Sequence, residues 1–245
     1  MPVRELGRAG GNPLAKPASS GGMTTYTEVL ITSGSGTYKP AAGFTSMRVT
    51  AVGAGASGAT RGSNSGAGGG CAISPVVAPS TITYSVGVGG LAGTDDGSSY
   101  IPQQPGTNTT ATFGAVSLSA NASVGGYSPG GDSTGGAANY SGGTGFNGGG
   151  GAGGTTSNGG NGNTASTGNG GGGGANPGSS TYGGGGGIGA RGGHDGAYYG
   201  KEPATQAWGS PGNGKNGGWP GGGGGAATAG KGGDGANGGI RIELW

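Results

Sequence analysis

A glycine motif that could bind a nucleotide lies near the middle of the N-terminal half of the chain. Residues 53–58 read GAGASG, a GxGxxG pattern directly after an expected strand. A dinucleotide site with this motif places pyrophosphate at a helix N-terminus. The next twelve residues, ATRGSNSGAGGG, oppose a helix, and residues 73–83 contain no acidic residue for the ribose. The pattern therefore favours a glycine tract entering a larger bundle over a nucleotide site.

The other candidate chemical groups are few and scattered. His194 is the only histidine and precedes Asp195, which could orient it as a base, but no Ser or Cys stands in a nucleophile motif. One His and one Cys exclude a structural zinc site within a single chain, although three copies of His194 on the axis of a homotrimer could bind a metal. Residues 95–97 (Asp-Asp-Gly) lack the other acidic positions of a calcium loop and predict a turn. We expect Cys71 to be a small buried residue, and we expect no catalytic residues, metal or cofactor, so not an enzyme.

The composition limits the elements that could position such groups. Gly supplies 74 of 245 residues and Pro 13, whereas Leu, Ile, Val and Phe together number only 26, which is few for an ordinary core. The net charge is +2, and the eleven Lys and Arg are not clustered. We therefore expect no nucleic-acid partner. The apolar runs are too short for a membrane span, and we expect no membrane insertion.

β-structure is expected in the first half and at the C-terminus. Thr, Val, Ile and Tyr gather in short runs that are separated by Gly, Ser and Pro, and no helical stripe occurs. A turn is expected at residues 33–36, and residues 240–245 alternate as a strand with one buried face. The other predicted strands are residues 25–32, 44–52, 71–77, 81–88 and, more weakly, 111–118.

The second half must be held together without a hydrophobic core. Residues 125–239 contain one Ile, one Phe and no Leu, Val or Met. Glycine runs in the polyproline II conformation point every N–H and C=O outward, so parallel or antiparallel rods can bond one another when side chains stay on outer faces. Edge rods should then carry larger residues at every third position, as Lys231, Asp234, Asn237 and Ile240 do. Ile188, Arg191 and His194 have the same spacing.

The fold class is therefore all-β plus polyglycine II, with a small sheet or sandwich frame, a bundle of rods and essentially no helix. Gly185, Gly186, Gly223 and Gly224 are the glycines we expect to be structural. A flexible linker is the alternative for these tracts.

Aromatic residues have no room inside a glycine lattice and should lie on loops or outer faces. Such side chains suit recognition of a protein or a sugar. The alternative is that they cover the flank of the bundle or pack against another subunit. The candidate receptor-binding residues are Tyr182, His194, Tyr198, Tyr199, Trp208 and Trp219.

The chain resembles the glycine-rich domain of phage tail-fibre proteins. The resemblance rests on TYTEVLITSGSGTYKPAAGFTSMRVTAVGAGASGA, TITYSVGVGG and the ending GKGGDGANGGIRIELW, and the glycine tracts are similar to those of T-even-type distal adhesins. It implies a fibre-tip adhesin in the virion, made in the host cytoplasm, whose loops bind a bacterial surface protein or glycan. A purely structural virion component (fibre, baseplate or capsid decoration) is the alternative.

The expected organisation has three parts. Residues 1–24 form an arm that attaches to other virion proteins, residues 25–124 a β-rich domain, and residues 125–245 the rod bundle with recognition loops, closed by the strand 240–245. A homo-oligomer is possible on this interpretation.

Overall fold

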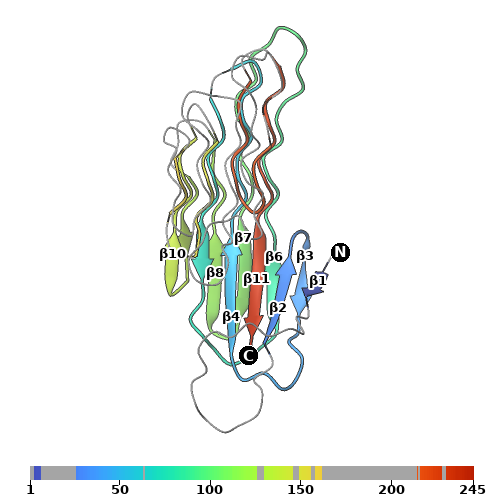
Figure 1. The fold of residues 1–245 in the computed structure, drawn as a ribbon, viewed down its shortest axis with the longest axis vertical. Coiled ribbons are helices and arrows are strands. Elements are labelled where there is room, and N and C mark those ends of the chain that lie inside the picture. Colours follow the sequence, from blue (N-terminus) through green and yellow to red (C-terminus); the bar gives the residue numbers. More distant parts are fainter. Residues whose placement is uncertain are drawn as a thin grey trace, which may run out of the picture.

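The computed structural model describes residues 3–6, 26–62, 64–125, 130–145, 149–155, 158–161, 214, 216–227 and 230–245. Two β-sheets lie at one end of an elongated molecule, and extended segments run from them to the other end (Figure 1). The described residues contain no helix, so none could cross a membrane as a helix.

Both sheets are antiparallel throughout. The first has six strands in the order β1-β2-β11-β4-β5-β10, and the second has five in the order β3-β6-β7-β8-β9. The strands are β1 (Val3–Leu6), β2 (Thr27–Ile31), β3 (Ser35–Tyr38), β4 (Met47–Val52), β5 (Cys71–Ile73), β6 (Ile82–Ser85), β7 (Thr109–Phe113), β8 (Val116–Ala120), β9 (Ser133–Thr134), β10 (Ala138–Tyr140) and β11 (Gly239–Leu244).

The two sheets enclose the apolar core of the sandwich. Val29, Val49 and Ile242 from the first sheet pack in one buried cluster with Phe113 and Leu118 from the second. The apolar core that the structure describes therefore lies between the sheets, and the all-β frame predicted from the composition is confirmed.

The described strands differ from the prediction where a glycine reverses the chain. The expected strand 111–118 is a hairpin of β7 and β8, because Gly114 lies between them with φ +51. The expected turn at 33–36 is confined to its first half, since Gly34 has φ +81 and β3 begins at Ser35. The strands β9 and β10 were not predicted, because two or three residues are too few to show the alternation of apolar and polar residues that indicates a strand.

The C-terminal strand β11 is buried on both faces, which corrects the expectation of one buried face. Arg241 and Glu243 form its polar side. The Glu243 carboxylate accepts from Arg48 Nε at 2.9 Å and from the Tyr26 hydroxyl at 3.1 Å, and it lies 3.5 Å from Arg241 Nη2. Burial raises the pKa of Glu243, but the Arg48 hydrogen bond and the charges of Arg241 and Arg48 outweigh burial and hold the pKa below its usual value.

Beyond β4 the chain continues as an extended rod, residues 53–61. Every third N–H of this rod donates to the same neighbouring segment, and the acceptor also moves by three positions. The donor–acceptor pairs are Gly53–Gly70, Ala56–Ala67 and Ala59–Asn64; Ala54–Thr107, Ser57–Gln104 and Thr60–Ile101; and Gly55–Ala236, Gly58–Gly233 and Arg61–Gly230. This period of three is that of the polyproline II helix, so these segments are the rods that the sequence predicts.

The carbonyl groups of the same rod bond three further segments. Ala54 accepts from Ser123, Gly55 accepts from Gly90, and Ala56 and Ala59 accept from Gly224 and Ala227. Three neighbours through N–H and three through C=O surround the rod with six others. Its backbone groups are therefore satisfied by a lattice in place of a sheet.

Glycine is required at the positions where a side chain would overlap the backbone of the next rod. A Cβ on Gly58 would overlap the carbonyl oxygen of Gly225, and one on Gly69 would overlap that of Gly53. Alanine occupies buried positions such as Ala54, Ala67 and Ala226, where a methyl group fits. Close approach of the backbones thus decides which positions are glycine.

The rod 230–238 lies at an outer position, as the spacing of Lys231, Asp234 and Asn237 predicts. The expectation is wrong for Ile240, the fourth residue of that series, which belongs to β11 and is fully buried in the core. Lys231 and Asp234 are half-buried and Asn237 is exposed, whereas Gly232, Gly233, Ala236 and Gly238 are buried. Asn237 and Asp234 accept hydrogen bonds at 2.9 Å from the N–H groups of Gly89 and Ala92. The N–H groups of Gly235 and Gly238 also donate to the carbonyl groups of Gly90 and Gly87, so side-chain oxygens add to the backbone bonds between these two rods.

Sheets and rods draw on both stretches of the sequence. The rods include residues 53–61 and 64–70 as well as 221–227, and the first sheet combines β2, β4 and β5 with β10 and β11. The expected division at residue 124 therefore does not separate sheet from rods.

Candidate receptor-binding tip

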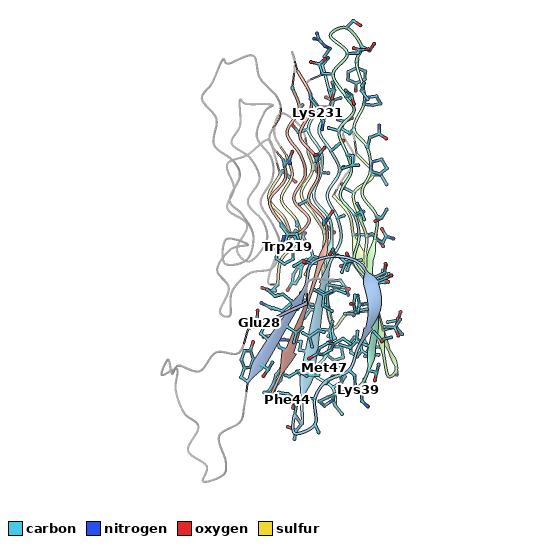
Figure 2. All side chains as sticks on the ribbon, turned by 90° about the vertical axis from the view of Figure 1, so that its right-hand side faces the viewer. Glu28, Lys39, Phe44, Met47, Trp219 and Lys231 are labelled. Atoms are coloured by element: carbon cyan, nitrogen blue, oxygen red, sulfur yellow. The ribbon has the colours of Figure 1, made fainter. Side chains whose placement is uncertain are left out.

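The end of the rods farthest from the sheets is formed by residues 60–62, residues 93–101 and residues 227, 230 and 231. Thr60 forms isolated β-bridges to Ile101 and to Ala227, which hold the three segments together. Figure 2 places Lys231 toward this end and Lys39 and Phe44 at the opposite, sheet end. We call this region the distal tip.

Arg61 connects the rods to the loop of the distal tip. Its backbone is left-handed, with φ 53, and it is the one described residue other than glycine with a positive φ. Its N–H donates to Gly230 at 3.1 Å, and its Nε donates to Asp95 Oδ1 at 2.6 Å. The hydrogen bond from Arg61, followed by that from the Gly97 N–H, lowers the pKa of Asp95.

Asp96 organises the turn of the same loop. Its Oδ1 accepts from the N–H groups of Ser98 at 2.8 Å and Ser99 at 2.7 Å, while Gly97 has φ +89. Hydrogen bonds from Ser99 and Ser98 lower the pKa of Asp96. The turn expected at residues 95–97 is confirmed. No group of three or more His, Cys, Asp or Glu that could hold a metal occurs in the described part of the chain.

Tyr100 presents an aromatic ring beside these charged groups. It is 54% exposed, and its ring lies against Gly62, where a Cβ would collide with it. The glycine thus lets the ring lie against the backbone. An exposed ring, a guanidinium and carboxylates on a short loop can bind a sugar or a peptide by stacking and hydrogen bonding.

Trp219 is the one sequence-predicted aromatic candidate within the described residues. It is half-buried, packs against the cluster of Val52, Cys71 and Ala152, and donates from Nε1 to the Gly238 carbonyl at 2.9 Å. The ring therefore covers the side of the rod bundle. A receptor contact at Trp219 stays a prediction.

The remaining sequence candidates divide between the lattice and the residues outside the description. A Cβ on Gly223 would overlap the Gly66 carbonyl oxygen, and one on Gly224 would overlap that of Gly233, so both lie at close contacts between rods. Tyr182, Gly185, Gly186, His194, Tyr198, Tyr199 and Trp208 lie outside the described residues.

The sequence did not identify Arg61 and Tyr100 as candidates. Tyr100 lies three positions after the end of the Asp-Asp-Gly turn, and an aromatic residue beside a turn is a usable signal. Arg61 and Asp95 are 34 positions apart, so only the packing of rods brings them together.

The sandwich and its rods define an all-β protein with a glycine-rod lattice. The chain belongs to the glycine-rich domain family, whose model matches residues 31–245. No curated protein matches it.

Proposed function

We propose that this chain is a receptor-binding adhesin at the tip of a bacteriophage tail fibre, which recognises a bacterial surface protein or glycan. The observation that carries the proposal is the position of the distal tip. The rods hold the loop of the distal tip at the end of the molecule opposite the sheets. The C-terminus lies at the sheet end (Figure 1). Recognition residues usually lie on loops of a rigid scaffold.

The chemistry of the distal tip supports recognition rather than catalysis. Tyr100 offers an exposed ring, while Arg61 and Asp95 hold each other at 2.6 Å and keep the loop in place. Such preorganisation lowers the entropy lost on binding. In this proposal residues 1–24 attach the protein to the fibre, and the protein resides in the virion.

Competition for phage adsorption tests this function. Purified protein should block adsorption of the parent phage, and the double variant Arg61→Ala/Tyr100→Ala should lose about thirtyfold in apparent affinity, the loss typical of a binding hot spot. Lys39→Ala is the matched control, because Lys39 is exposed at the sheet end. A second set, Tyr198→Ala, Tyr199→Ala and Trp208→Ala, tests three of the receptor-binding residues predicted from the sequence.

The outcomes separate the alternatives. If saturating wild-type protein leaves adsorption unchanged, the adhesin proposal is wrong. If only the second set loses blocking, the receptor site includes Tyr198, Tyr199 and Trp208 and not the distal tip.

A structural virion component is the second candidate. The observation that favours it is Trp219, whose ring packs on the rods and leaves only part of its surface for a partner. This candidate predicts that Trp219 becomes fully protected in assembled particles, as measured by oxidative footprinting against the free protein.

A further inference from the structure

Exposed apolar side chains gather on the rods that continue from the second sheet. Val88, Leu91 and Val124 are 56%, 67% and 70% exposed. Their segments are neighbours, since the Thr107 N–H donates to Val88 and the Gly106 N–H donates to Ser123. Large apolar side chains exposed together on adjacent rods are typical of an interaction surface.

The rod geometry explains why these side chains face outward. Val88 and Leu91 are three positions apart and therefore share one face of a three-fold rod. Gly89 and Gly90 between them are buried, and a Cβ on Gly90 would overlap the Gln104 carbonyl oxygen. The pattern places glycine against the lattice and larger residues toward solvent.

The same side of the molecule continues onto the outer face of the second sheet. Thr83 on β6 pairs with Thr112 on β7, which pairs with Ser117 on β8, and all three are exposed. We call the surface formed by β6, β7, β8 and the segments 86–93, 101–108 and 121–125 the neutral flank. In Figure 2 these green segments run along one side of the molecule, from the sheets to the tip.

No charged residue belongs to the segments that form the neutral flank. Asp132 and Asp234 lie at its borders, where they accept hydrogen bonds from the Asn121 side chain and the Ala92 N–H. Between Arg61 and Asp132 the sequence contains only two charged residues, Asp95 and Asp96, and both belong to the distal tip. Depletion of charged residues is the compositional feature that distinguishes the centre of a protein interface from the rest of a surface.

We propose that the neutral flank is an interface between two copies of this chain. Hydroxyl groups both donate and accept hydrogen bonds, and an uncharged apolar stripe is not repelled by its own copy, so the surface is self-complementary about a two-fold axis. The area of this face follows from its dimensions. Rods of about seven residues are about 22 Å long, strands of about five residues are about 17 Å long, and three neighbouring segments spaced about 4.8 Å apart set the width. The flat area is then roughly 550 Å², to which protruding side chains add. This approaches the area per partner of a small stable interface, about 600 Å².

Sedimentation measurements test the interface independently of the adhesin proposal. The wild-type chain should form a reversible dimer, and Leu91→Lys or Thr112→Lys should weaken it at least about tenfold, because a lysine would be desolvated without a partner. Val76→Lys is the matched control, since Val76 is 55% exposed outside the flank. Circular dichroism establishes that each variant is folded.

Thiol labelling provides a second measurement that does not require charged variants. Cys71 is fully buried, and burial raises its pKa to about 12, so in Leu91→Cys the new thiol is the one expected to react. Labelling of Leu91→Cys should slow as the dimer forms, whereas that of Val76→Cys should not. The proposal is wrong if the wild-type chain is monomeric at every concentration. It is also wrong if a dimer forms but Leu91→Lys and Thr112→Lys weaken it no more than Val76→Lys does, and Leu91→Cys is labelled like Val76→Cys.

Discussion

The ion pair of Arg61 and Asp95 connects the distal loop to the rod that carries Arg61. Arg61 has a left-handed backbone at the end of its rod, and its Nε donates to Asp95 Oδ1 in the loop. The contact is polar and partly exposed, with side-chain exposures of 29% and 26%. It orders the loop more than it stabilises the whole protein.

We predict that Arg61→Gln raises the pKa of Asp95 toward the usual value of about 3.9. In the wild type the folded-state pKa is lowered, so the stabilising contact is fully present above the unfolded-state pKa. It is lost as the pH falls through the lowered folded-state pKa. An NMR titration of the Asp95 carboxyl carbon measures the shift. The control is Lys231→Gln, which removes the ion pair with Asp234 at 3.6 Å and should leave the pKa of Asp95 unchanged. If the pKa of Asp95 in Arg61→Gln equals that of the wild type, the Arg61–Asp95 ion pair does not lower it.

At the scale of the element, the rods depend on the absence of a side chain at particular positions. We predict that Gly223→Ala destabilises the fold by at least about 3 kcal/mol, because the new methyl group would overlap the Gly66 carbonyl oxygen in a packed lattice. Thermal unfolding followed by circular dichroism measures the loss.

Gly97→Ala is the matched control for the lattice. A Cβ there meets nothing within 4 Å, and only the positive φ of +89 opposes it, at a cost of about 1–2 kcal/mol. Equal melting temperatures for Gly223→Ala and the wild type would mean that the rods do not pack as closely as described.

At the scale of the whole molecule, the C-terminal strand closes the first sheet. β11 pairs with β2 on one side and β4 on the other, and Ile240, Ile242 and Leu244 belong to the core. We predict that deletion of residues 239–245 abolishes cooperative folding, since it separates β2 from β4 and exposes the core. Deletion of residues 1–6 is the control, because β1 pairs only with β2 at the edge of the sheet. A cooperative melting transition in the C-terminal deletion would contradict this role.

The sequence by itself determined the class of fold and the chemistry of the rods. With 74 glycines and few large apolar residues, backbone hydrogen bonds must replace much of the core, and the spacing of Lys231, Asp234 and Asn237 predicted an outer rod. The buried Cys71 was also predictable, because a free cysteine usually behaves as a small buried apolar residue. The turn at residues 95–97 was predictable because it depends on neighbours in sequence.

Only the tertiary structure decided which rods are neighbours and what they bring together. Glycine tracts are nearly interchangeable as sequences, so nothing local specifies that residues 53–61 bond 64–70, 101–107 and 230–236. The Arg61–Asp95 pair, the burial of Arg241 and Glu243, and the alignment of Val88 with Val124 on one side all follow from that choice. The physical reason for this choice of neighbours is the register of backbone hydrogen bonds between distant segments. The sheets from which the rods extend set that register.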